Sequence, residues 1–280
     1  MNVYISADME GITGTVSWAQ CGRPATEHFD WAFARRMMTH DVNAAVRGAR
    51  AAGAVRVLVM DAHGTSRNLL VDELEPGTEL LSGLLPHALG MMTGLDPSFG
   101  CAMLVGYHAM AGTLAGTMEH TIMGTIHRFW INGVPAGEMT LSALTAGSLG
   151  VPLVFVSSDD KGCAEAESLF PGVRTATVKH GVGRYCARLL HPSVTDPLIE
   201  RAAQDAVSQA SGVAPYRIEP PYQAVIEYNQ TEEADAACLM PGSVRTDAYS
   251  IELESPDWDE FHRMVRRSMS LSGQGVFGTR

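Results

Sequence analysis

The hydrophobic residues of the chain gather in short unbroken runs, and longer segments of helical periodicity lie between them. Four mainly hydrophobic runs are predicted to be strands: residues 3–7, 55–60, 101–105 and 151–156. Runs without polar alternation are typical of strands that helices cover on both faces. Apolar residues recur at helical spacing over residues 30–52 and 138–148, which predicts helices between strands. This order indicates an α/β fold with a mostly parallel central sheet flanked by helices.

The pattern of the chain changes after about residue 190. Four segments are predicted there as helix, strand, strand and helix: residues 194–211, 224–228, 249–253 and 258–271. An earlier segment, residues 125–134, is predicted to form a short hairpin that turns at Asn132-Gly133. We therefore expect a metal-binding, catalytic α/β domain at residues 1–190 and a smaller α+β lobe at residues 191–280.

Side chains that can bind a cation follow the ends of three predicted strands. Asp8 and Glu10 stand two positions apart after the first strand, so their carboxylates point to the same side and repel each other unless a cation lies between them. His63 follows the second strand and His108 follows the third. Ligands bind at the carboxyl ends of the strands in parallel α/β sheets, so these four side chains are expected to meet. A single histidine is more often a packing residue, but two at equivalent strand ends favour a metal site.

A third carboxylate, Glu138, is a candidate for the same site. It opens the predicted helix at residues 138–148, where the helix dipole alone favours an acid, and its distance from the other candidates depends on how the chain winds. With Glu138 included, the imidazoles and carboxylates have the ligand chemistry of zinc. Three carboxylates leave a small positive excess on two Zn²⁺ ions, which a hydroxide would neutralise, whereas a single ion would be overcompensated. Charge balance therefore favours two zinc ions, with the short, central Asp8 between them.

His120 follows a glycine-rich loop that begins just after the third strand. It is as consistent with an ordinary surface histidine as with a general acid or base, a role that suits an imidazole because it titrates near neutral pH. Three weaker signals have ordinary interpretations. Asp61 is expected to orient His63, Asp159 to cap a helix, and Lys179 to lie in a solvated loop.

Composition narrows the class of protein. The net charge of −11 argues against a nucleic-acid or anionic-membrane partner, because phosphate groups attract basic surfaces. The five cysteines are scattered without a paired spacing, which indicates a reducing compartment. Neither a signal peptide nor a membrane-spanning run is visible, so a cytoplasmic location is expected.

An ordered set of motifs resembles the M55 peptidases, a family of D-aminopeptidases. The motifs are Ser6-Ala7-Asp8-Met9-Glu10-Gly11, Asp61-Ala62-His63, Gly106-Tyr107-His108-Ala109, Met118-Glu119-His120 and Gly137-Glu138. The resemblance implies two zinc ions per subunit and a catalytic role for His120. The zinc ligands that it implies, with Asp8 as the bridge, are Asp8, Glu10, His63, His108 and Glu138. It also implies a homo-oligomer, a self-compartmentalising ring of ten subunits.

The same resemblance implies substrates that are short peptides with a free N-terminus. D-Ala-D-Ala is one of them, although some members of the family prefer L-peptides. The chain departs from the family pattern chiefly over residues 15–30 and in the tail after Ser272. The first of these segments follows the first metal-binding motif and could line the substrate pocket. Stereochemical preference is therefore left open.

The leading hypothesis is a dinuclear zinc aminopeptidase. A metal-dependent hydrolase of another class, such as an amidase or a phosphoesterase, is an alternative, because the same ligands would serve it equally well. A third possibility is a peptide- or metal-binding protein without turnover, against which His120 argues because storage needs no additional titrating group.

Overall fold

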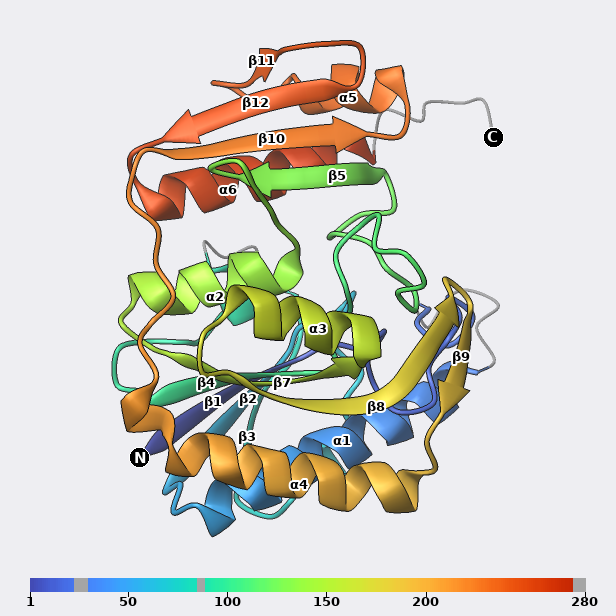
Figure 1. Ribbon diagram of the computed structural model, residues 1–280, viewed down its shortest axis with the longest axis vertical. Helices are drawn as coiled ribbons and strands as arrows, with labels where there is room; N and C mark the ends of the chain where they lie inside the picture. The colour runs from blue at the N-terminus through green and yellow to red at the C-terminus, as the bar shows by residue number, and fades with distance from the viewer. Residues whose placement is uncertain (23–29, 85–88, 274–280) are drawn as a thin grey trace.

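The computed structural model describes residues 1–22, 30–84 and 89–273, and Figure 1 shows its layers. A seven-stranded sheet has the strand order β3-β2-β1-β4-β7-β8-β9. Its strands are β1 (Asn2–Ala7), β2 (Arg56–Asp61), β3 (Glu79–Leu81), β4 (Cys101–Val105), β7 (Leu153–Asp159), β8 (Arg174–Gly183) and β9 (Cys186–Leu189). Neighbouring strands from β3 to β8 run parallel, and β9 is antiparallel to β8. The expected fold class, a mostly parallel central sheet between helices, is confirmed.

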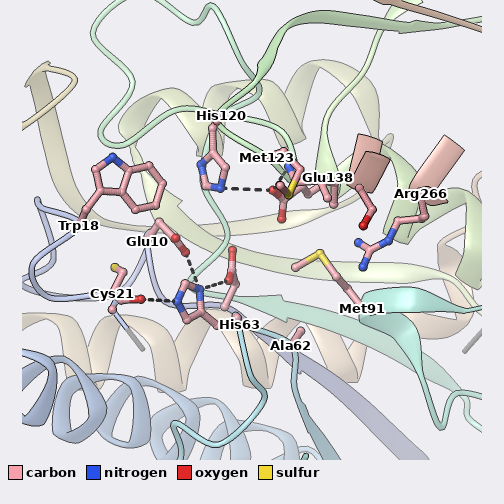
Figure 2. Close-up of a pocket in the computed structure, with 16 residues that line it drawn as sticks. Glu10, Trp18, Cys21, Ala62, His63, Met91, His120, Met123, Glu138 and Arg266 are labelled. Atoms are coloured by element: carbon pink, nitrogen blue, oxygen red, sulfur yellow. Dashed lines mark hydrogen bonds and ion pairs between the residues drawn. The ribbon is translucent and has the colours of Figure 1, made fainter. Parts of the chain in front are cut away.

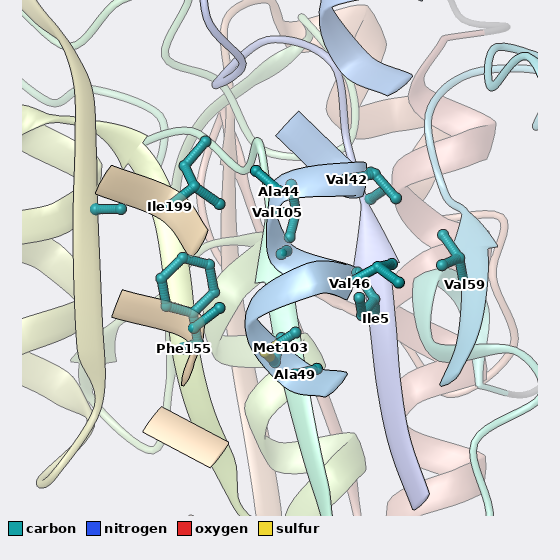
Figure 3. Close-up of a cluster of buried hydrophobic side chains, with 14 of the residues drawn as sticks. Ile5, Val42, Ala44, Val46, Ala49, Val59, Met103, Val105, Phe155 and Ile199 are labelled. Carbon is teal, nitrogen blue, oxygen red and sulfur yellow. The ribbon is translucent and has the colours of Figure 1, made fainter. Parts of the chain in front are cut away.

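Helices cover both faces of this sheet (Figure 1). They are α1 (Trp31–Ala51) and α4 (Pro192–Ser208) on one face, and α2 (Glu138–Ser148) and α3 (Asp160–Leu169) on the other. Successive residues of β1 enter opposite layers because side chains alternate along a strand. Ile5 belongs to the buried cluster that contains Val42 of α1 and Ile199 of α4 (Figure 3). Tyr4 belongs to the cluster that contains Met139 of α2, so the strand buries apolar side chains on both faces.

A second, five-stranded sheet forms a separate layer, in the order β11-β12-β10-β5-β6 (Figure 1). Its strands and helices are β5 (Ile126–Ile131), β6 (Val134–Pro135), β10 (Tyr222–Tyr228), α5 (Thr231–Ala237), β11 (Val244–Arg245), β12 (Ser250–Ser255) and α6 (Trp258–Ser272). All neighbouring strands in this sheet are antiparallel. Ile226 of β10, Leu253 of β12 and Phe261 of α6 share one buried cluster, which holds α6 against the sheet.

Two segments lie in a different layer from the residues that neighbour them in the sequence. The hairpin β5–β6, which turns at Asn132-Gly133 as predicted, pairs with β10 although it lies before residue 190. Helix α4, which follows residue 190, packs against α1 beneath the first sheet. A division into residues 1–190 and 191–280 therefore remains a prediction. The hairpin β5–β6 and helix α4 each pack in the layer formed mainly by the other part of the chain.

Several short or edge elements have no counterpart among the predicted ones. Strands β3, β8 and β9 carry mixed polar and apolar residues, because only parts of them are buried. The 3₁₀ turns η1 (Val71–Glu73), η2 (Gly90–Met92) and η3 (Ala210–Gly212) are too short to give a periodic signal. No helix within the described ranges is long and apolar enough to cross a membrane.

Candidate metal centre

The candidate site forms where β1, β2 and β4 end side by side. The loops after β1 and β4 pack backbone against backbone: Asp8 N donates to Val105 O at 2.8 Å, and Gly11 N donates to Gly106 O at 2.7 Å. A Cβ atom on Gly11 would lie 1.7 Å from the carbonyl oxygen of Tyr107, so this approach requires glycine. The loop that carries the two neighbouring carboxylates is thereby placed beside the loop that follows β4.

The two carboxylates and two imidazoles predicted to meet do so, and Glu138 joins them. Figure 2 shows Glu10, His63 and Glu138 around the cavity beside this cluster. His63 Nδ1 lies 3.1 Å from Asp8 Oδ1 and 3.0 Å from Glu10 Oε2. The other oxygen of Asp8, Oδ2, lies 3.5 Å from His108 Nε2. His108 Nε2 in turn lies 3.3 Å from Glu138 Oε1. Asp8 therefore presents one oxygen to each of two neighbouring groups of ligand atoms.

Helix α2 begins at this cluster, which settles the winding that the sequence left open. Glu138, its first residue, accepts a hydrogen bond from Ile122 N at 2.6 Å. His120 Nε2 lies 3.6 Å from Glu138 Oε1, and its ring stacks on that of His108 with centroids 4.0 Å apart and planes 12° apart. Trp18 packs edge-on against His120, with centroids 5.0 Å apart. His120 is thus a buried member of the cluster and not an ordinary surface histidine.

Three buried atoms of the cluster have no hydrogen-bond partner within the described part of the chain: Asp8 Oδ2, Glu10 Oε2 and His108 Nε2. Glu10 Oε2 faces His63 Nδ1 as an ion pair, but not in hydrogen-bond geometry. Burying such an atom without a partner costs about 1–3 kcal/mol. Because all three are electron-pair donors facing one another, the arrangement fits a bound cation.

The remaining ring nitrogens are held by backbone carbonyls. His63 Nε2 lies 2.9 Å from Cys21 O, and His108 Nδ1 lies 3.0 Å from Ala109 O. Histidines that bind metals commonly donate their second ring N–H in this way, which fixes the ring and its tautomer. When the second nitrogen of each ring donates its hydrogen to a carbonyl, His63 Nδ1 and His108 Nε2 are the nitrogens that could coordinate a metal ion beside the carboxylates.

Burial and mutual charge perturb the carboxylates of the cluster. Burial raises the pKa of Asp8, and the charge of Glu10 raises it further, to about 7. Burial also raises the pKa of Glu10, but the facing His63 outweighs it and holds that pKa below its usual range. The pKa of Glu138, raised by burial, is lowered more strongly by His108, to about 2. The carboxylates of Glu10 and Glu138 are thus held in their ionised form by the imidazoles that face them.

The imidazoles divide into two kinds. Burial lowers the pKa of His108, but Glu138 and Asp8 outweigh it and raise that pKa to about 10. The pKa of His63 is likewise lowered by burial and raised well above its ordinary value by Glu10 and Asp8. Burial and the neighbouring His108 instead lower the pKa of His120. The carboxylates thus favour the protonated forms of His63 and His108, whose protons a metal ion would displace, whereas burial favours the neutral form of His120.

Lys179 is buried beneath the loop that carries Glu10, so the expectation of a solvated loop is wrong. Its side chain is 0% exposed, and Nζ donates to the carbonyl oxygens of Glu10 at 2.5 Å, Ile12 at 3.0 Å and Thr15 at 2.7 Å. Three carbonyls that point to one place need a cationic donor with several hydrogens, and lysine provides it. The side chain enters from β8, a strand that the sequence pattern did not reveal.

Two acidic residues behind the cluster hold loops. Asp61 accepts bonds from Asn68 N, Asn68 Nδ2 and Leu69 N, and it makes no hydrogen bond with His63, so the expectation that it orients this ring directly is wrong. Asn68 Nδ2 also donates to His63 O at 2.8 Å, which ties the two loops together. Asp159 caps α3 as predicted, accepting from Gly162 N at 2.8 Å.

A cavity of about 690 Å³ opens beside the cluster, and Figure 2 shows the side chains around it. Trp18 and Cys21 line it, as does Arg266 from α6. Trp18 and Cys21 belong to the segment that departs from the family pattern, of which residues 23–29 lie outside the described residues. The sequence pattern did not single out any of these three. A bulky indole just after a metal-binding motif is the one signal that could have been noticed.

Comparisons with known proteins agree with the fold and show the family of the chain. The model of the family "Peptidase_M55: D-aminopeptidase" matches residues 1–267. A D-aminopeptidase of Bacillus subtilis (strain 168) is 34% identical over 270 residues, which are 95% of each chain. A solved structure described as "Zn-dependent D-aminopeptidase DppA from Bacillus subtilis, a self-compartmentalizing protease" superposes with a TM-score of 0.93 at 31% identity, over 99% of this chain and 100% of the other. The chain belongs to the M55 family of D-aminopeptidases.

Proposed function

We propose that this enzyme is a dinuclear zinc aminopeptidase that removes the N-terminal residue of short peptides, D-amino-acid dipeptides such as D-Ala-D-Ala among them. The observation that carries the proposal is the position of Asp8, whose two oxygens face two separate groups of ligand atoms. A carboxylate shared in this way suits a bridge between two ions. The Zn-dependent solved relative supports zinc as the metal.

The proposed ligands divide evenly around Asp8. Glu10 and His63 would hold one ion with it, and His108 and Glu138 would hold the other. Imidazole and carboxylate donors of this kind are the usual partners of zinc. The unpartnered buried atoms support the assignment, because a bound cation would satisfy them.

Zinc ions bound here would polarise the scissile carbonyl and lower the pKa of a water to near neutrality. His120 would move the proton. Its Nδ1 lies 2.9 Å from Met118 O, so Nδ1 carries the hydrogen and Nε2 is free to accept one on the side of Glu138. The neutral form that burial favours is the form that takes a proton from the nucleophile and returns it to the leaving amine.

The first test is hydrolysis of D-Ala-D-Ala and of L-Ala-L-Ala by zinc-loaded protein, with a chelator-treated control. Chelator-sensitive release of D-Ala is the expected result. Cleavage of the L-dipeptide alone would keep the mechanism and reverse the stereochemical assignment. Failure to cleave either, with cleavage of an amide or a phosphoester, would favour the alternative hydrolases. Stable binding without any turnover would favour a binding protein.

A second test concerns His120. Replacement by alanine should reduce kcat by roughly 10²-fold or more, the usual contribution of a general acid or base, while zinc content stays unchanged. His127→Ala is the matched control, since His127 is exposed and pairs with Glu227 on the second sheet. Loss of zinc from His120→Ala would show instead that His120 is a metal ligand, for which its position beside His108 and Glu138 also leaves room.

We also propose a cytoplasmic homo-oligomer, a ring of ten subunits. All five cysteines carry free thiols, which suits a reducing compartment. The solved relative is described as self-compartmentalizing, which supports assembly of several chains around their sites.

A further inference from the structure

The guanidinium group of Arg266 has an unusual position. Arg266 projects from α6, a helix of the second sheet layer, into the cavity beside the candidate metal centre (Figure 2). Its side chain is only partly exposed, and it makes no hydrogen bond or ion pair with any described residue. Arginine has five donors and rarely enters a protein interior without an acceptor. The neighbouring Arg263 and Arg267 are exposed, as expected of arginines on a surface helix.

The guanidinium of Arg266 lies in a cavity whose other charged side chains include three carboxylates. The carboxylates of Asp8, Glu10 and Glu138 line the same cavity, and no other arginine or lysine in the described residues does. Burial lowers the pKa of Arg266, and Glu138 is too far away to form an ion pair with it. The cavity therefore has one wall formed by candidate metal ligands and one separate cationic group that can bind an anion.

A short peptide carries both of the charges that this cavity can match. In the proposed function its N-terminal end lies at the metal centre, so its C-terminal carboxylate lies at the other end of the peptide and can reach a cation there. The planar guanidinium fork matches a carboxylate with two parallel hydrogen bonds, which a lysine cannot do. Gly90, whose φ is +54°, leaves room for the side chain: a Cβ there would lie 3.4 Å from Arg266 Nε.

We propose that Arg266 binds the C-terminal carboxylate of the substrate, so that the enzyme selects very short peptides with a free C-terminus. The inference rests on the proposed aminopeptidase function and names its substrate more closely. A peptide extended at its C-terminus, or capped as an amide, would place no carboxylate on Arg266. The substrate carboxylate would thus supply the hydrogen-bond acceptor that the guanidinium lacks in the free enzyme.

The test compares the free acid D-Ala-D-Ala with its C-terminal amide in zinc-loaded wild-type protein and in Arg266→Gln. Wild-type kcat/KM should be roughly 10- to 100-fold higher for the acid, as one charge-assisted pair contributes. Arg266→Gln should lose that factor, chiefly through KM, and should cleave the amide as the wild type does. Arg263→Gln, on the same helix but outside this cavity, should leave both rates unchanged.

Three outcomes would overturn the proposal. The wild type could cleave acid and amide equally well, Arg266→Gln could lose both activities in equal measure, or its melting temperature could fall by several degrees. The last two would identify a structural role, whereas removal of an unpaired cation should leave the melting temperature unchanged or raise it.

A binding measurement separates this inference from the function on which it rests. If the wild type cleaves neither peptide, calorimetric titration with D-Ala-D-Ala still tests Arg266. Weaker binding to Arg266→Gln, with unchanged binding of the amide, supports the carboxylate contact even though the aminopeptidase proposal has failed. Equal affinity of both proteins for the acid overturns the contact.

Discussion

A single buried lysine holds the loop that carries two of the candidate ligands. Replacement of Lys179 by methionine would leave the carbonyls of Glu10, Ile12 and Thr15 without their donor. We expect the free energy of unfolding to fall by about 2 kcal/mol or more, and zinc to be lost more readily to a chelator. Chemical denaturation and metal analysis after dialysis measure the two effects.

The chain offers a matched control for this change. Lys161 is the only other lysine in the sequence, and it pairs at the surface with the neighbouring Asp160. Lys161→Met should therefore change neither quantity by much. An equal effect of both substitutions would show that the buried contacts of Lys179 contribute little.

Glu165 makes stability depend on pH. Its Oε2 accepts from Met110 N at 2.7 Å, whereas Oε1 is buried without a partner, and burial raises the pKa of the side chain from 4.5 to about 7. The folded protein thus keeps a proton that the unfolded chain releases. The contribution to stability is complete below pH 4.5 and is lost as the pH rises through about 7, to a total of about 3 kcal/mol.

Glu165→Gln removes this dependence, because glutamine does not titrate. Urea unfolding at pH 5 and pH 8 should show that the wild type loses more stability over this range than the variant does. Glu167→Gln, at an exposed position of the same helix, is the control and should follow the wild type. Parallel pH profiles for wild type and Glu165→Gln would contradict the raised pKa.

At the scale of elements, the junction of the loops after β1 and β4 depends on Gly11. An alanine there would place its Cβ against the backbone of Tyr107, and a backbone carbonyl cannot move aside as a side chain can. We expect Gly11→Ala to lower the free energy of unfolding by about 3 kcal/mol or more, or to prevent folding. Thermal unfolding measures the change. Gly212→Ala, where a Cβ meets nothing within 4 Å, should be tolerated, and similar stability of the two variants would refute the steric argument.

At the scale of the whole molecule, the loop after His108 offers a surface for assembly. Leu114 in this loop is 90% exposed, and Val182 near the end of β8 is 68% exposed. The two segments touch, since a Cβ on Gly181 would meet Ala115 O. Exposed apolar patches of this kind mark interfaces.

We expect light scattering of the wild type to give ten times the 30.0 kDa chain mass, and Leu114→Asp to give a smaller species. Leu239→Asp, at a position 74% exposed in the second sheet layer, should leave the mass unchanged. A wild-type mass of one chain would refute the assembly itself. A full-size Leu114→Asp oligomer would place the interface elsewhere.

The predictable parts of the fold are those whose burial is uniform. Strands β1, β2, β4 and β7 lie between two helix layers, so their residues are apolar on both faces and form unbroken runs. Strands β8 and β9, the last two at one end of the sheet, are only partly buried, so their composition resembles that of a loop. Pairing of the hairpin β5–β6 with β10, about ninety residues later, depends on contacts that no local pattern records.

For the candidate site, the order of residues along the chain was enough to predict the ligand chemistry: carboxylates and imidazoles at strand ends, where a parallel sheet gathers them. Three features became visible only in the folded chain: α2 starts at this cluster with Glu138, Lys179 lies under the first loop, and Arg266 reaches the cavity from another layer. The physical reason is that strand direction is a local property, which places neighbouring strand ends together. The approach of elements far apart in the chain is set by packing of the whole molecule, and no spacing along the sequence encodes it.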